Sequence, residues 1–120
     1  MEDFVTFEIA VKLKEKGFRE KVNAYYGKYE NIFNIHPALD MNDADYRASA
    51  PTISQVLKWL RKEKKIICLP HIEPFKENWF FYVVILPQPS DFPEYMYSIN
   101  YNTYEQAALA GIGYVLDNLI

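Results

Sequence analysis

The longest apolar stretch of the chain is "WFFYVVIL" at residues 79–86, and it limits what this sequence can fold into. Eight residues make a β-strand of ordinary length, whereas a membrane-spanning helix needs roughly 20 apolar residues. A strand that is apolar at every position needs cover on at least one face, which favours a central place in a sheet. The stretch therefore predicts a folded domain built on a sheet.

Other segments predict partners for this strand. Residues 66–72, "IICLPHI", predict a second strand, joined to the first by a hairpin loop at 73–78. Residues 87–94 contain three prolines, which exclude regular structure there. "YMYSINY" at 95–101 predicts one more strand.

The first half of the chain predicts a hairpin and a long loop. Residues 22–35 are rich in aromatic and branched side chains, with Gly27 in the middle, and predict one or two strands turning near Gly27. Residues 36–51, "HPALDMNDADYRASAP", predict a loop, because turn-forming Asn and Asp lie between two prolines. A loop of this length is often functional. A variable insertion without a function is the other interpretation.

A helix is predicted at residues 7–16. Thr6 is placed to cap its first turn, and Gly17 supplies the left-handed residue that ends a helix. Phe18 follows, where it can fold back onto the last turn. The apolar side chains share one broad side of this helix.

Two more helices are predicted at 52–65 and 104–119. Thr52 stands at the start of the first and Thr103 directly precedes the second. Each Thr is followed three residues later by Gln, which is the pattern of a capping box. Apolar residues line one face of the first at the helical period, namely Ile53, Val56, Leu57 and Leu60. In the last helix Gly111 costs roughly 1 kcal/mol relative to alanine. We therefore expect Gly111 to make a compensating close contact with a strand or a helix backbone.

Together these elements predict an α+β fold in which about three helices pack a small, mainly antiparallel sheet. The length of 120 residues predicts a single domain spanning 1–120 with one core. Aromatic residues make up 17% of the chain. They either build the core of the sheet or form binding surfaces, and composition alone leaves both interpretations open.

Positive charge is concentrated in two windows, although the net charge is −3. Ten of the thirteen Lys and Arg residues lie at 12–21 and 58–65. These windows would form one basic face if they were neighbours in space. A basic helix followed by a hairpin also matches the second half of a winged-helix unit. That alternative predicts nucleic-acid contacts from Lys58, Arg61, Lys62 and Lys65. Against it, the charge lies at the helix C-terminus, where it also complements the helix dipole.

No motif predicts catalysis, a metal or a cofactor. Cys68 and His71 lie three residues apart in the strand predicted at 66–72, so their side chains are expected on opposite faces. The aspartates of 36–51 lack the spacing of a calcium loop. The four glycines are scattered rather than gathered in a phosphate-binding loop. We therefore expect no enzymatic activity and no cofactor.

The N-terminal sequence and the single cysteine favour a cytoplasmic location. "MEDFVTFEIA" lacks the basic and apolar regions of a signal peptide. One cysteine forms no intrachain disulfide, which fits a reducing compartment. No membrane association is predicted.

Three stretches resemble an uncharacterised family of small proteins from gut-type bacteria and their phages or mobile elements. They are "FVTFEIAVKLKEKGF", "APTISQVLKWLRKEKKI" and "TYEQAALAGIGYVLDNLI", in the same order and over nearly the whole chain. The resemblance implies an accessory protein of mobile-element origin, and no functional residue is carried over.

The function predicted from the sequence is a non-catalytic binding module that contacts a protein partner or a second copy of itself. Aromatic excess without a catalytic constellation motivates this prediction. The expected contact surfaces are the tyrosine-rich segments 25–29 and 95–104. Their candidate contact residues are Tyr25, Tyr26, Tyr95, Tyr97 and Tyr101.

Overall fold

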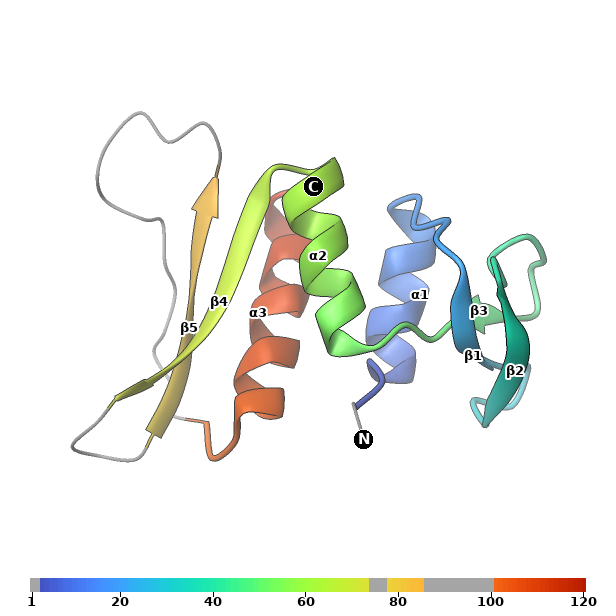
Figure 1. Ribbon diagram of the computed structural model, residues 1–120, viewed down its shortest axis with the longest axis horizontal. Coiled ribbons are helices and arrows are strands. Elements are labelled where there is room, and N and C mark those ends of the chain that lie inside the picture. Colours follow the sequence, from blue (N-terminus) through green and yellow to red (C-terminus); the bar gives the residue numbers. More distant parts are fainter. Residues whose placement is uncertain (1–2, 74–77, 86–100) are drawn as a thin grey trace. The chain divides into compact units, whose positions relative to one another are not determined.

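The computed structural model describes residues 3–73, 78–85 and 101–120, and the chain divides into two compact units. The first unit is Met1–Thr52 and the second is Ile53–Ile120. The described residues contain three helices and two antiparallel sheets, one in each unit (Figure 1). The predicted α+β class with antiparallel strands is therefore confirmed, and the strands are divided between two sheets.

The first unit places helix α1 (Phe7–Glu15) against a three-stranded sheet. The strands are β1 (Val22–Tyr26), β2 (Ile32–Leu39) and β3 (Ala48–Ser49), in the order β2-β1-β3. β1 is thus the central strand, and β2 is an edge. The core of this unit is formed by fully buried apolar side chains, including Val5, Leu13, Phe18, Val22 and Ala24.

Both ends of α1 follow the sequence prediction. The Thr6 hydroxyl accepts a hydrogen bond from the Ile9 amide at 3.3 Å. Gly17 has a φ of +87°, and the amide of Phe18 donates to the carbonyl of Leu13 at 3.0 Å. This pattern is a Schellman motif, in which a left-handed glycine lets the chain satisfy the last helical carbonyls.

The hairpin near Gly27 is confirmed, but the predicted loop at 36–51 is wrong in part. Residues 36–39 belong to β2, and two residues of the predicted loop form β3. The β1–β2 register shifts, because Val22 pairs with Leu39 while Ala24 pairs with Asn34. Proline is tolerated in β2 because edge strands and bulges do not require its missing N–H.

The second unit contains α2 (Ile53–Glu63), α3 (Tyr104–Asn118) and a two-stranded sheet. β4 (Ile66–Glu73) and β5 (Asn78–Ile85) pair antiparallel without interruption. Figure 1 shows both helices on one side of these strands, and α3 contacts both of them. The predicted helix–hairpin order is therefore present.

β5 has a neighbour on each side at one position. Trp79 pairs with Ile72 of β4, and it exchanges two backbone hydrogen bonds of 2.8 Å with Tyr101. This agrees with a central place for β5. The rest of the strand predicted at 95–101 lies outside the described residues, as do the predicted irregular segment 87–94 and most of the hairpin loop.

Helix α2 buries the face that the sequence predicts, and α3 begins at the predicted cap. Ile53, Val56, Leu57 and Leu60 of α2 are buried, and so is Trp59. The Thr103 hydroxyl caps α3 by accepting from the Gln106 amide at 3.1 Å. The Gln106 side chain reaches back to the amide of Asn102, one residue beyond the position that a standard capping box uses.

Gly17 and Lys65 provide a matched test of left-handed backbone after a helix. Lys65 follows α2 with a φ of +59°. A side chain in this region costs about 1 kcal/mol. Gly17→Ala should therefore lower the free energy of unfolding by about 1 kcal/mol, because no atom lies near the added Cβ and only backbone strain acts. Lys65→Gly should raise it by up to about 1 kcal/mol. Urea denaturation followed by circular dichroism measures both changes in the free energy of unfolding. A Gly17→Ala variant as stable as the unmodified protein would contradict the backbone strain expected at this position.

Candidate binding site in the first unit

The exposed basic residues of the second unit lie where the sequence predicts them. Lys58, Arg61 and Lys62 are on the exposed side of α2, and Lys65 follows the helix. Within the described part of the chain, no hydrogen bond or ion pair engages these four side chains. The element before α2 is β3, whereas a winged-helix unit has a helix there.

The other basic window, 12–21, belongs to the first unit, and part of its charge is used internally. The Arg19 Nε donates to the Asp40 carboxylate at 2.6 Å. Lys14 donates to backbone carbonyls, as described below. This window is therefore not a uniformly free basic face.

The predicted contact tyrosines have different surroundings. Tyr26 is a scaffold residue, because its hydroxyl donates to the Val5 carbonyl at 2.7 Å and its ring packs edge-on against Phe7. Tyr25 stacks on Phe33 of β2 with ring centroids 5.4 Å apart. Tyr101 is half-buried and pairs with Trp79 of β5. Tyr95 and Tyr97 lie outside the described residues.

Two further tyrosines are the most exposed large apolar side chains among the described residues. Tyr29, within the predicted segment 25–29, is 81% exposed, and Tyr46 is 63% exposed. The sequence does not predict Tyr46 as a contact residue, because it lies in an acidic stretch that resembles a solvated loop. Its only sequence signal is an aromatic residue beside an arginine, two residue types that are enriched at interfaces.

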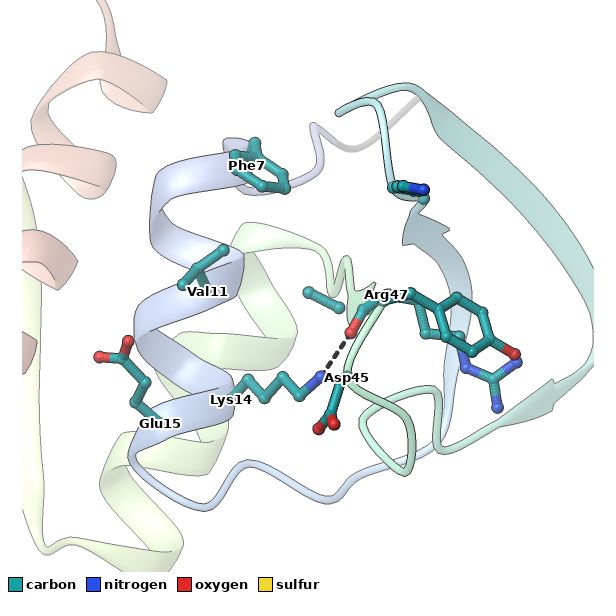
Figure 2. A pocket seen from close by; sticks show the side chains of 10 residues that line it. Phe7, Val11, Lys14, Glu15, Asp45 and Arg47 are labelled. Atoms are coloured by element: carbon teal, nitrogen blue, oxygen red, sulfur yellow. Dashed lines mark hydrogen bonds between the residues drawn. The ribbon is translucent and has the colours of Figure 1, made fainter.

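A cavity of about 780 Å³ lies in the first unit beside Tyr46 (Figure 2). One wall is α1, which contributes Phe7, Val11, Lys14 and Glu15. The opposite wall is formed by Gly27 and Lys28 of the β1–β2 turn and by residues 45–48. A volume of this size lies in the range of ligand-binding pockets.

The α1 wall is a single helical face. Phe7, Val11 and Lys14 are spaced at i, i+4 and i+7, so they project on the same side of the helix. Figure 2 shows Lys14 extending toward Arg47 and Asp45, while Glu15 points to the other side. Phe7 and Val11 belong to the apolar side predicted from the sequence, but they are half-buried and line the cavity instead of the core.

Lys14 joins the two walls of the cavity. Its ammonium donates to the backbone carbonyl of Arg47 at 2.7 Å and to that of Ala44. An ammonium has three N–H donors, so one is left over. Among the described residues, no carboxylate forms an ion pair with Lys14. The result is a half-buried positive charge at the cavity, held by neutral oxygens.

The Arg47 guanidinium is compensated by its own acidic partner. It pairs with Asp43, and it lies over the ring of Tyr46 at 5.6 Å. The hydrogen bond from Arg47 lowers the pKa of Asp43, because it stabilises the charged carboxylate. The pair therefore persists above the ordinary pKa of aspartate and is lost as pH falls through the lowered value.

Asn42 fixes the segment that carries Tyr46 and Arg47. Its side-chain amide donates to the Phe18 carbonyl at 2.8 Å, and its oxygen accepts from the Ser49 amide at 2.8 Å. The Ser49 hydroxyl in turn accepts from the Met41 amide at 3.0 Å. Asn42 is only 6% exposed, so the cavity wall depends on a buried polar network.

Among the described residues, the acidic and sulfur-containing side chains do not gather into a metal site. No group of three or more His, Cys, Asp or Glu side chains is arranged to hold a metal ion there. Cys68 is buried against Gly111, and burial raises the pKa of its thiol to about 12. His71 is exposed and contacts the rings of Phe80 and Tyr82. As expected, the strand separates Cys68 and His71 onto opposite faces.

Comparison of the chain with family models, curated proteins and solved structures finds no match. In the described part of the chain, no helix has the length and apolar character needed to cross a membrane.

Proposed function

We propose that the chain is a non-catalytic binding module whose first unit binds a polypeptide partner at the cavity beside Tyr46. The observation that carries the proposal is a cavity of about 780 Å³ flanked by Tyr46, which is 63% exposed, and next to the β1–β2 turn that bears Tyr29. Exposed tyrosines beside a pocket are typical of binding hot spots, because they bury a large area with little conformational entropy to lose.

Additional apolar area surrounds the cavity. Phe33 is 43% exposed, stacks on Tyr25 and covers Gly27, which lines the cavity. This continuity supports a partner larger than a single small molecule. It would cover the aromatic pair and insert one group into the cavity.

The faces of the sheet suit a partner better than its edge does. β2 is an edge strand of the sheet as described, but it is irregular, because its pairing with β1 shifts between Val22 and Ala24 and residue 37 is a proline. Bulges and prolines are devices that protect edge strands from pairing with another chain. Strand addition along β2 is therefore disfavoured, and side-chain contacts with the cavity and the tyrosines are favoured.

Selection from a random peptide library displayed on phage tests this proposal without a known partner. Tyr46→Ala should weaken the selected peptides at least tenfold, the usual size of a hot-spot effect. Tyr104→Ala, which removes another exposed tyrosine in the second unit, should leave affinity within twofold. Failure to enrich any peptide, or equal binding by both variants, would reject the proposal.

Self-association is tested with the same Tyr46→Ala variant. If the partner is a second copy, sedimentation velocity should show a dimer at micromolar concentration that Tyr46→Ala dissociates.

The proposed setting is an accessory protein of mobile-element origin acting in the cytoplasm.

A second candidate function is nucleic-acid binding by α2. The observation that favours it is the set of exposed cations without acidic partners in the described part of the chain, Lys58, Arg61, Lys62 and Lys65. Phosphate contacts release counterions, so affinity should fall steeply with salt. Fluorescence anisotropy with a DNA duplex at low and high salt measures this. Absence of binding at low salt, or equal binding after all four residues are changed to glutamine, would exclude this function.

A further inference from the structure

We infer that the cavity selects an apolar group that carries one adjacent carboxylate. On the proposed function, on which this inference rests, the partner peptide presents an apolar side chain next to an acidic residue or to its own C-terminal carboxylate. The inference follows from the charges and the apolar surface that line the cavity.

The positive charge of Lys14 provides the attraction for an anion. It is half-buried, two of its three N–H donors are used by backbone carbonyls, and no described carboxylate pairs with it. Charges removed from water are normally paired, since desolvation is costly. A ligand carboxylate that reached the remaining donor of Lys14 would supply both a hydrogen bond and a direct ion pair, which no described carboxylate forms with Lys14.

Two of the other charged lining residues, Arg47 and Asp45, limit the ligand to a single negative charge. The Lys28 ammonium lies over the ring of Tyr29 at 5.6 Å, and Glu15 points away from Lys14. Arg47 is already paired with Asp43, so its charge is compensated. Asp45 lines the same end of the cavity as Lys14, as Figure 2 shows. A second negative charge on the ligand would be repelled by Asp45. A carboxylate therefore fits better than a phosphate dianion.

The apolar lining residues determine which apolar group the ligand carries. Phe7 and Val11 lie on the turns of α1 that precede Lys14, and Ala48 lies on the opposite wall. A ligand anchored at Lys14 would thus extend its apolar group along Val11 toward Phe7. An aromatic or branched aliphatic group matches this surface, because it would bury apolar area on both sides.

Three small probes that share one ring test this chemistry on the unmodified protein. They are 3-phenylpropanoate, its neutral amide, and 3-phenylpropylamine, and each is titrated while amide chemical shifts are followed by NMR. The carboxylate should bind at least fivefold more tightly than the amide, and the amine most weakly. An amide or amine that binds as tightly as the carboxylate would overturn the inference. Phenyl phosphate that binds more tightly than the carboxylate would also overturn it.

Variants of Lys14 identify the cation. Lys14→Arg retains the charge and should retain the preference for the carboxylate over the amide. Lys14→Met should abolish the preference, whereas Lys58→Met, a control on the exposed side of α2, should not change it. Lys14 also holds the cavity wall, so the far-ultraviolet circular dichroism of each variant is compared first. The comparison of probes on the unmodified protein remains decisive if Lys14→Met is unfolded.

The library experiment separates this inference from the proposed function. Enriched peptides that pair an apolar residue with a neighbouring carboxylate support both. Enriched peptides that lose affinity on Tyr46→Ala but carry no acidic group support the proposed function and overturn the inference. Preferential binding of 3-phenylpropanoate without any enriched peptide supports the cavity chemistry and overturns the polypeptide partner.

Discussion

Replacing Asn42 with alanine should lower the free energy of unfolding by about 3 kcal/mol, because its side chain hydrogen-bonds two buried backbone groups. The carbonyl of Phe18 and the amide of Ser49 each bond to this side chain at 2.8 Å, and both residues are fully buried. An unsatisfied buried polar group costs about 1–3 kcal/mol. Urea denaturation followed by circular dichroism measures the change.

Asn34→Ala is the matched control for this substitution. Asn34 is exposed on β2, so its removal should change stability by less than about 0.5 kcal/mol. Because Asn42 fixes the segment before β3, its loss should also weaken ligand binding at the cavity. Equal stability of the two variants would show that the network does not hold the cavity wall.

Replacing Gly111 with valine should lower the free energy of unfolding by more than about 3 kcal/mol, although valine is a better helix former than glycine. A Cβ atom at this position would lie 2.5 Å from the Cys68 sulfur and 3.1 Å from Cγ of Phe81. Both neighbours are buried in the sheet, so neither has free space to move into. Gly111→Ala should cost about 2 kcal/mol net, and thermal unfolding ranks the variants.

A double-mutant cycle isolates the cause of this effect. Cys68→Ala removes the nearest atom, so Gly111→Ala should be less damaging in that background, with a coupling of at least about 1 kcal/mol. Additive effects would place the cost at Phe81, which remains in that background, or in the helix itself. In that case the close approach of α3 to β4 would not explain why glycine is required.

Local signals in the sequence predict the ends of the helices and the hairpin. The cap at Thr6, the left-handed Gly17 and the turn near Gly27 depend on residues close in the chain, so pattern alone identifies them. The close contact of Gly111 was also predictable, since an interior helical glycine needs a reason. The structure adds that strand side chains, rather than a backbone, make the contact.

The cavity was not predictable, because it depends on contacts between distant segments. Lys14 belongs to a basic window, and nothing near it in sequence indicates that it holds carbonyls 30 and 33 residues away. Phe7 and Val11 have the same periodicity whether their face is covered by a core or lines a cavity. β3 has two residues, and its pairing with β1 has no local signature.

Mapping a selected peptide by amide chemical shifts tests the central claim, that the first unit holds the binding site. The predicted result is a set of perturbed amides in α1 between Phe7 and Glu15, in the turn at Gly27 and Lys28, and at residues 44–48. Perturbations confined to α2 or to the β4–β5 sheet would contradict the claim.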